Sequence, residues 1–245
     1  MISIEELREV GKILGIKNIG YVEKNYFHHL ILLSISREIE NLIFKGGTCL
    51  FLTYGLNRFS EDLDFSLIKT LNIEKFTTII KKYLSKFGAE TKIKKIKESK
   101  TTLLFDLSIK GILYTGTPDT SCNIKIDIGK LPVFLKTKQI FLHPLYGDIP
   151  SYPLKVMDER EILAEKLALL FERNDPKDVY DLWFLLKKGV KMDFSLAWRK
   201  LGEKKNKQEI LNQITLFENR WKELKFFVLD LPKFEKIKKE LKSYF

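Results

Sequence analysis

The sequence predicts an α/β (α+β) protein in which a mixed β-sheet flanked by helices is followed by a bundle of helices. Up to about residue 128, short apolar segments typical of strands alternate with helical patterns. Beyond Pro144, Pro150 and Pro153 the strand signal disappears and helical patterns recur. We therefore expect two domains, residues 1–154 and 155–245, within the 245-residue chain.

The first half is expected to begin with a short helix, because Ser3 and Glu6 have the spacing of a capping box. Leu42-Ile43-Phe44 is a short apolar run that ends at two glycines, which indicates a buried strand. The lysine-rich segment 91–97 suits a strand at a sheet edge. The elements expected after the first helix are helix 22–40, strand 42–44, helix 48–54, strand 63–67, helix 73–87, and strands 91–97, 102–109 and 123–128.

Helix-start signals divide the second half. Asp158 and Glu161 have the spacing of a capping box, which gives Glu161 a structural role. Asp175 followed by Pro176 is a strong start signal for the next helix. The expected helices cover residues 159–172, 177–187, 207–224 and 234–242.

Composition excludes several classes of protein. No apolar run approaches the ~20 residues that cross a bilayer, and no charged segment followed by an apolar one opens the chain. We therefore expect a cytoplasmic protein with no membrane partner. Cys49 and Cys122 lack Cys-x-x-Cys spacing and the histidines form no ligand pattern, so neither a zinc site nor a disulfide is expected.

The net charge of +11 favours a polyanionic partner, although a lysine-rich genome gives the same excess without one. Eight lysines fall between residues 81 and 100, where the only acids are Glu90 and Glu98. This stretch is interpreted either as a solvated helix end and edge strand or as a surface that faces RNA.

Asp62 and Asp64 form an Asp-x-Asp pair at a predicted strand. Alternate residues of a strand face the same side, so the two carboxylates lie together while Leu63 faces the core. Adjacent carboxylates repel each other unless a cation lies between them, and hard oxygen ligands suit Mg²⁺ or Mn²⁺. The pair alone also fits an ordinary polar strand end.

Gly46-Gly47-Thr48 lies at a predicted strand-to-helix junction, one short helix before the aspartates. Glycines there let the backbone approach a phosphate, the helix N-terminus presents free amides, and Thr48 adds a hydroxyl. Arg58 and Ser60 would add a guanidinium and a second hydroxyl for phosphate oxygens. Arg58 has Glu61 as an alternative partner on the surface.

A third carboxylate is needed to complete a metal site and to accept a proton. Asp127 lies on a predicted strand whose isoleucines face one side while Lys125 and Asp127 face the other. Asp106 on the preceding strand is the competing candidate. Both positions also fit the polar face of a half-exposed strand.

In the helical half, Lys166 falls on the apolar stripe of its helix, with Arg173 on roughly the same face. It is expected either to extend out of a helix interface or to contact a triphosphate across the domain boundary. The helix dipole accounts for Asp178 near a helix start, whereas Asp181 has less local explanation.

From about Val22 to Leu185, the chain resembles the AbiEii/AbiGii family of abortive-infection nucleotidyltransferase toxins, within the DNA polymerase beta-like nucleotidyltransferase superfamily. Several ordered motifs carry the resemblance and are more specific together than any one alone. They are VEKNY (22–26), FKGGT (44–48), RFSEDLDF (58–65), KID (125–127), EKLAL (165–169) with Arg173, and KDVYDL (177–182).

The resemblance implies a minimal nucleotidyltransferase sheet followed by a helical bundle. It also implies that Asp62 and Asp64 bind metal, and it favours Asp127 over Asp106 as the third carboxylate. Further implied roles are triphosphate binding by Gly47 and Thr48, and a supporting role at the site for Lys166, on phosphate, and Asp178. The chain departs from the family pattern at Asn25, Cys49 and Lys177, none of which is a metal ligand.

The expected function is metal-dependent transfer of a nucleoside monophosphate from a nucleoside triphosphate to an acceptor hydroxyl, in a toxin paired with an antitoxin. Basic charge and the resemblance favour RNA as acceptor, at the 3′ end of a transfer RNA. Two alternatives stay open. One is a protein or small-molecule acceptor, including kinase-like transfer, and the other is a non-catalytic module that binds RNA or an antitoxin.

Overall fold

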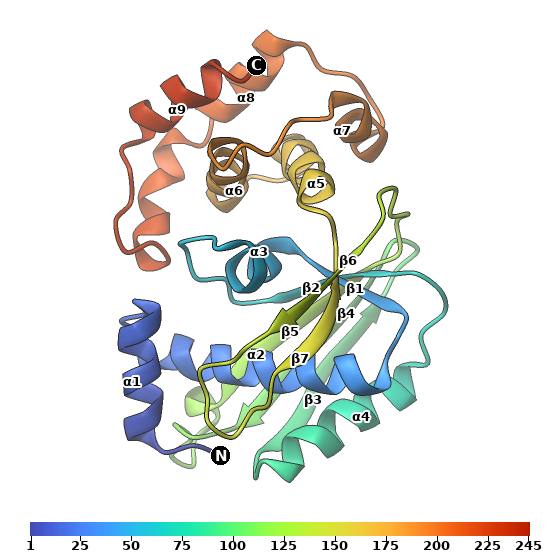
Figure 1. Cartoon of the computed structure of the whole chain (residues 1–245), viewed down its shortest axis with the longest axis vertical. Helices are drawn as coiled ribbons and strands as arrows, with labels where there is room; N and C mark the ends of the chain where they lie inside the picture. Colours follow the sequence, from blue (N-terminus) through green and yellow to red (C-terminus); the bar gives the residue numbers. More distant parts are fainter. The chain divides into compact units, whose positions relative to one another are not determined.

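The computed structural model describes all 245 residues, which divide into two compact units (Figure 1). The first unit comprises residues 1–53, 59–133 and 137–156, and the second comprises 54–58, 134–136 and 157–245. The main break follows Val156, two residues after the expected end of the first domain. Two short segments, Tyr54–Arg58 and Phe134–Lys136, belong to the second unit although they precede that break.

A seven-stranded mixed sheet forms the framework of the first unit, in the order β3-β4-β5-β2-β1-β7-β6. The central strand β2 pairs antiparallel with β1 and parallel with β5, and β1 pairs parallel with β7. The mixed α/β class expected from the sequence is therefore confirmed. The strands are β1 (Leu42–Lys45), β2 (Leu63–Leu67), β3 (Glu90–Glu98), β4 (Thr102–Lys110), β5 (Cys122–Gly129), β6 (Lys138–Leu142) and β7 (Tyr152–Val156).

Helices α2 and α4 cover one face of this sheet (Figure 1). Phe76 of α4 packs against Phe105 of β4 with ring centroids 4.7 Å apart, and His29 of α2 hydrogen-bonds Tyr152 of β7. The sheet's inner face, which these helices cover, carries buried residues such as Ile126 that alternate with less buried ones on the opposite, outer face. The helices are α1 (Ile4–Leu14), α2 (Ile19–Glu38), α3 (Gly46–Tyr54), α4 (Ile73–Lys86) and the 3₁₀ turn η1 (Pro118–Thr120).

The expected elements of the first half are present, and Ser3 and Glu6 form the capping box predicted for α1. Strands β6 and β7 correct the expectation that strands end near residue 128, because both lie beyond it. Pro153, read as a strand breaker, sits inside β7. Strand β7 pairs with β1 only at Val156, opposite Phe44. Pro153 lies outside this pairing, so its missing N–H costs no hydrogen bond to β1.

The second unit is helical. Helix α5 packs against α6, α7 and α8, and α6 also packs against η2 and α9. Trp183 donates to Glu240 at 2.6 Å and Trp221 donates to the carbonyl of Pro232 at 2.8 Å, so both buried indoles are satisfied. The elements are α5 (Glu159–Glu172), α6 (Pro176–Lys187), α7 (Phe194–Leu201), α8 (Lys207–Thr215), the 3₁₀ segment η2 (Glu218–Phe226) and α9 (Phe234–Lys242).

Three details of the second half differ from expectation. Helix α7 was not predicted, and the single helix expected over 207–224 is divided into α8 and η2. Glu161 does not form a capping box. Its buried carboxylate accepts the backbone N–H groups of Phe134 and Leu135 and lies 2.6 Å from Lys200, which attaches the 134–136 segment to this unit. Its role is structural, as predicted, but through a partner distant in the sequence.

Candidate functional site

Asp64 and Asp127 are direct neighbours in the sheet. They are register partners on the parallel strands β2 and β5, so both side chains leave the outer face. Both are half-buried, whereas Asp62 is exposed just before β2 begins. The competing candidate, Asp106, pairs in register with Lys125, one strand further from Asp64. The structure thus places Asp127, and not Asp106, beside Asp64.

Lys45 extends this row of charges. It is the register partner of Asp64 on β1, so the outer face carries Lys45, Asp64 and Asp127 side by side on three neighbouring strands. A Cβ placed on Gly129 would lie 3.7 Å from the Lys45 Nζ atom, so the ammonium reaches β5 near the position two residues beyond Asp127. Sequence reasoning did not select Lys45. Its position at the end of β1, directly before the glycines, was the available signal.

The Gly46-Gly47 turn comes very close to the carboxylate row. Gly46 has φ +74°, and a Cβ there would lie 2.1 Å from the Oδ2 atom of Asp64. Only glycine fits this position without moving Asp64. The predicted strand-to-helix junction is therefore present at the β1–α3 connection, and its backbone passes against one carboxylate of the row.

Thr48 has a different contact from the one expected. It is buried in α3, and its hydroxyl donates to the backbone carbonyl of Asp62 at 2.5 Å. This bond ties the residue before β2 to the glycine turn and so holds Asp62 near that turn. Ser60, expected to contact phosphate, is half-buried in the first unit.

The donor chemistry of this row fits a divalent cation, because Asp62, Asp64 and Asp127 offer the hard carboxylate oxygens that Mg²⁺ and Mn²⁺ prefer. Asp64 and Asp127 are already adjacent. No group of three or more His, Cys, Asp or Glu side chains in the structure has the arrangement of a metal site. The adjacent pair, with Asp62 two residues along the chain, is what the fold preorganises.

The second unit contains a separate buried ion cluster. Lys166 of α5 lies 2.8 Å from both Asp178 and Asp181 of α6, and all three side chains are 5% exposed or less. Arg173 donates to both oxygens of Asp178, at 2.7 and 2.9 Å. Arg58 binds Asp181 in the same two-pronged way, at 2.7 and 2.6 Å.

This cluster shows the partners of three residues that the sequence analysis singled out. Arg58 forms a buried pair with Asp181, and Glu61 lies 3.3 Å from Lys24. Lys166 does not extend to the surface, because it is buried between two aspartates. Asp181, which lacked a local explanation, has two basic partners.

Electrostatics keeps the cluster ionised. Burial alone would raise the pKa of Asp178, but the charges of Lys166 and Arg173 outweigh burial and lower that pKa to about 2. Burial alone would likewise lower the pKa of Lys166, yet Asp178 and Asp181 raise it above its ordinary value. Three cations and two carboxylates leave the cluster with one net positive charge.

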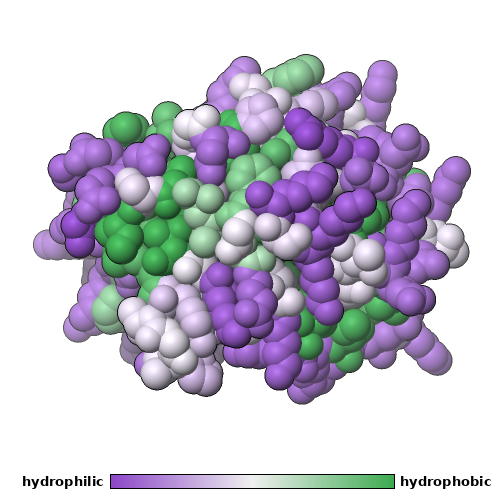
Figure 2. All heavy atoms as spheres, turned by 90° about the horizontal axis from the view of Figure 1, so that it is seen from below, coloured by the Kyte–Doolittle hydropathy of each residue, from purple (hydrophilic) through white to green (hydrophobic).

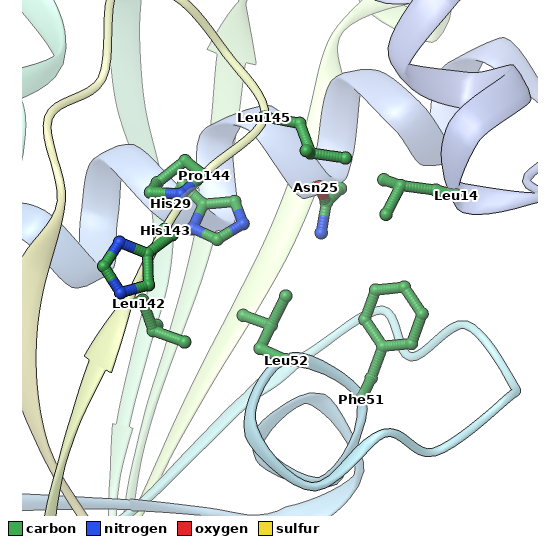
Figure 3. Close-up of a pocket in the computed structure, with 9 residues that line it drawn as sticks. All are labelled: Leu14, Asn25, His29, Phe51, Leu52, Leu142, His143, Pro144 and Leu145. Atoms are coloured by element: carbon green, nitrogen blue, oxygen red, sulfur yellow. The ribbon is translucent and has the colours of Figure 1, made fainter.

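A pocket of about 180 Å³ opens elsewhere in the first unit (Figure 3). The Asn25 side-chain oxygen accepts from Tyr146 at 2.8 Å, while its Nδ2 atom points toward the pocket without a hydrogen-bond partner. Burial lowers the pKa of His29 to about 3, so this ring is neutral at pH 7. The lining residues, none of them a predicted site residue, are Leu14, Asn25, His29, Phe51, Leu52, Leu142, His143, Pro144 and Leu145.

The surface is mostly polar where Figure 2 shows it. Hydrophilic residues dominate that view, with hydrophobic residues in separate groups between them. None of the helices has the length and apolar character that crossing a membrane requires.

A family model covers most of the chain. Residues 30–242 match the family model described as the nucleotidyl transferase AbiEii toxin of a Type IV TA system. An uncharacterized protein of Aquifex aeolicus (strain VF5) is 26% identical over 143 residues, a match that spans 58% of this chain and 56% of that protein.

Two solved structures share the fold. One is MenT4, a nucleotidyltransferase toxin of Mycobacterium tuberculosis H37Rv, with a TM-score of 0.69 and 16% identity over 100% of this chain and 89% of the other. The second is JHP933 from Helicobacter pylori, with a TM-score of 0.63 and 19% identity over 91% of this chain and 89% of the other.

Proposed function

This chain belongs to the AbiEii family of nucleotidyl transferase toxins, and we propose that it transfers a nucleoside monophosphate from a nucleoside triphosphate to a hydroxyl group of RNA. The observation that carries the proposal is the row of Asp64 and Asp127 in register on β2 and β5, against which the Gly46 turn is packed. Paired carboxylates beside a glycine turn at a helix start suit a metal-bound triphosphate.

Asp62, Asp64 and Asp127 are the residues that would hold Mg²⁺ or Mn²⁺, which neutralises phosphate charge and makes a bound hydroxyl more acidic. In the transfer, the acceptor hydroxyl oxygen forms a bond to the α-phosphorus as the bond from that phosphorus to the pyrophosphate oxygen breaks. A carboxylate oxygen of Asp127 accepts the hydroxyl proton. Gly46 and Gly47 let the backbone approach the phosphates, and Lys45 adds a positive charge at the row.

The ion cluster of the second unit contains Lys166, the cation that we assign to a phosphate contact. A lysine ammonium has three donors; Lys166 donates one hydrogen bond to Asp178 and lies 2.8 Å from Asp181 in an ion pair, which leaves a donor for another partner. We assign the remaining donor to a triphosphate oxygen, with Asp178 holding Lys166 in place. Lys166→Met should raise the KM for the nucleotide roughly tenfold; an unchanged KM in steady-state assays would leave the cluster a purely structural role.

RNA as the acceptor is supported by the net charge of +11, and a transfer RNA 3′ end is the most specific candidate that the family offers. A cognate antitoxin is the partner that membership of a toxin–antitoxin family suggests. We propose that both encounters take place in the cytoplasm.

The test is label transfer. Wild-type protein and Asp62→Ala are each incubated with Mg²⁺, one α-labelled nucleoside triphosphate at a time, and total RNA. We expect label on RNA of transfer-RNA size with wild type only, and release of pyrophosphate. Label that persists with a folded Asp62→Ala protein would contradict the assignment of the carboxylates.

The leaving group separates this proposal from its alternatives. Nucleoside diphosphate in place of pyrophosphate would indicate γ-phosphate transfer, as in a kinase. Label that appears on protein or a small molecule, and not on RNA, would keep nucleotidyl transfer and reject the RNA acceptor.

A further inference from the structure

The outer face of the sheet carries lysines on the same side as the carboxylate row. Lys92, Lys95 and Lys97 of β3 pair in register with Ser108, Asp106 and Leu104 of β4, which are outer-face positions. Lys125 continues the set onto β5, where its register partner is Asp106. These four lysines, named here the lysine face, are all exposed.

The acids of β3 do not neutralise the lysine face. Glu90 is paired with Lys110 at 2.8 Å, and Glu98 with Lys130 at 2.7 Å. None of the four lysines of the face lies within 4.0 Å of a carboxylate oxygen. Asp106 is the one acid between them, so the face carries a clear positive excess.

Strand register connects the lysine face to the proposed site. Lys97, Leu104, Asp127 and Asp64 are successive register partners on β3, β4, β5 and β2. At ~4.8 Å between neighbouring strands, β3 lies ~10 Å from the strand that carries Asp127. That distance equals about three stacked nucleotides at ~3.4 Å each.

Protection of the sheet edge is the ordinary explanation for lysines on β3, because charged side chains discourage pairing with another chain. It does not extend to Lys125, which lies on β5, two strands inside the edge. Lys94 also reaches inward, donating to Asn123 of β5 at 2.6 Å. The positive surface therefore extends from the edge toward the carboxylates.

We infer that the lysine face binds the sugar–phosphate backbone of the RNA acceptor and leads its 3′ end to Asp127 and Asp64. This inference rests on the proposed function, since it names where that acceptor lies. Lysines without base-reading partners provide affinity through phosphate contacts and little sequence preference. Selection of one RNA then depends on other contacts or on RNA shape.

The test compares two charge-matched triple variants, both in an Asp62→Ala background that prevents turnover. One is Lys92→Gln/Lys95→Gln/Lys97→Gln on the lysine face. The control is Lys75→Gln/Lys81→Gln/Lys82→Gln on α4, which covers the opposite face and whose three lysines are also exposed. Fluorescence anisotropy with a labelled transfer RNA, at several KCl concentrations, gives the Kd and its salt dependence.

We expect the lysine-face variant to weaken RNA binding roughly 10- to 100-fold at ~0.1 M salt, and to reduce the slope of log K against log salt by about 2. The α4 variant should change binding less than threefold. Equal losses of RNA affinity in both variants would mean that RNA is attracted only by the net positive charge of the protein, and would overturn the inference. Unchanged RNA affinity in the lysine-face variant would also overturn it and would leave the face to an acidic protein partner.

Failure of the proposed function gives a different pattern. If the protein without substitutions puts no label on RNA from any nucleotide, while the lysine-face variant alone loses RNA affinity, transfer to RNA is rejected and the binding face is supported. If RNA is labelled normally and both triple variants bind it equally well, transfer is supported and the face is rejected.

Discussion

The carboxylate row of the first unit and the ion cluster of the second unit balance their charges in opposite ways. The row of Lys45, Asp64 and Asp127, counted together with the neighbouring Asp62, has an excess of two negative charges on partly exposed side chains. The cluster of Lys166, Arg58, Arg173, Asp178 and Asp181 carries one excess positive charge, and four of its five side chains are almost fully buried.

This difference shows which group of residues the fold itself requires. Buried ions must be paired, so the cluster is largely satisfied within its own unit and losing one member is costly. The partly exposed row with excess negative charge is where we propose that a cation from solution binds. Substitution in the cluster should therefore reduce stability first, with a nucleotide effect only at Lys166, and substitution in the row should reduce activity.

The largest effect on stability is expected from Asp181→Ala, which leaves Arg58 and Lys166 buried without this partner. The free energy of unfolding should fall by about 3–5 kcal/mol, measured by urea denaturation. The double variant Arg58→Met/Asp181→Leu, which removes both ends of the pair, should recover much of that loss. A cost below about 1 kcal/mol for Asp181→Ala would contradict the structural role given to the cluster.

Asp64→Asn tests the carboxylate row, where we expect activity and not stability to be lost. Activity should fall 10²- to 10³-fold, equivalent to about 2.7–4 kcal/mol of transition-state stabilisation. The free energy of unfolding should change by less than about 1 kcal/mol, because the side chain is only half-buried. Assays of kcat and urea denaturation on the same preparation give both values, and a large loss of stability would remove the contrast.

Gly46→Ala should affect stability and activity together. The residue has φ +74°, and the new methyl group would meet the Asp64 carboxylate at 2.1 Å. We expect a loss of about 2–3 kcal/mol in stability and a loss of activity as Asp64 is displaced. Gly55→Ala is the matched control, since φ is +77° there and nothing lies within 4 Å of the added atom. Equal activity in both variants would contradict a role for the close approach.

The smallest effect concerns acid. The folded-state pKa of Asp178 is about 2 against an ordinary value of 3.8, so its ionised form stabilises the folded protein above about pH 4. That contribution, on the order of 2 kcal/mol, should disappear as the pH falls from about 4 to about 2. Urea denaturation across this range should show a steeper loss in wild type than in Asp178→Asn. Parallel curves would mean that Asp178 is not held ionised by its partners.

Periodicity predicted most of the fold, because hydrophobic alternation and caps act locally. It correctly placed Asp127 on the polar side of its strand, and the glycines at a strand-to-helix junction. It missed β6 and β7, where Pro153 reads as a breaker although its strand pairs with β1 at only one position. Local sequence rules do not indicate which residues of a strand hydrogen-bond to a neighbouring strand.

The partners of the charged candidates were harder to predict. Arg58 was assigned a phosphate or nearby Glu61, yet it binds Asp181, 123 residues away. Thr48 was assigned a phosphate, and its hydroxyl is hydrogen-bonded to the Asp62 carbonyl. In each case the sequence identified a polar group that needs a partner, and the fold provides one from a distant segment of the chain.

The sequence by itself determined which face of each strand is polar, where several helices begin, and which family the motifs resemble, because these depend on residues close together in the chain. Only the tertiary structure decided that Lys45, Asp64 and Asp127 form one row and that Lys166 lies between two aspartates. The physical reason is that strand register and ion pairing join segments far apart in sequence. Which of those segments meet is decided by the packing of the whole unit and not by local sequence preferences.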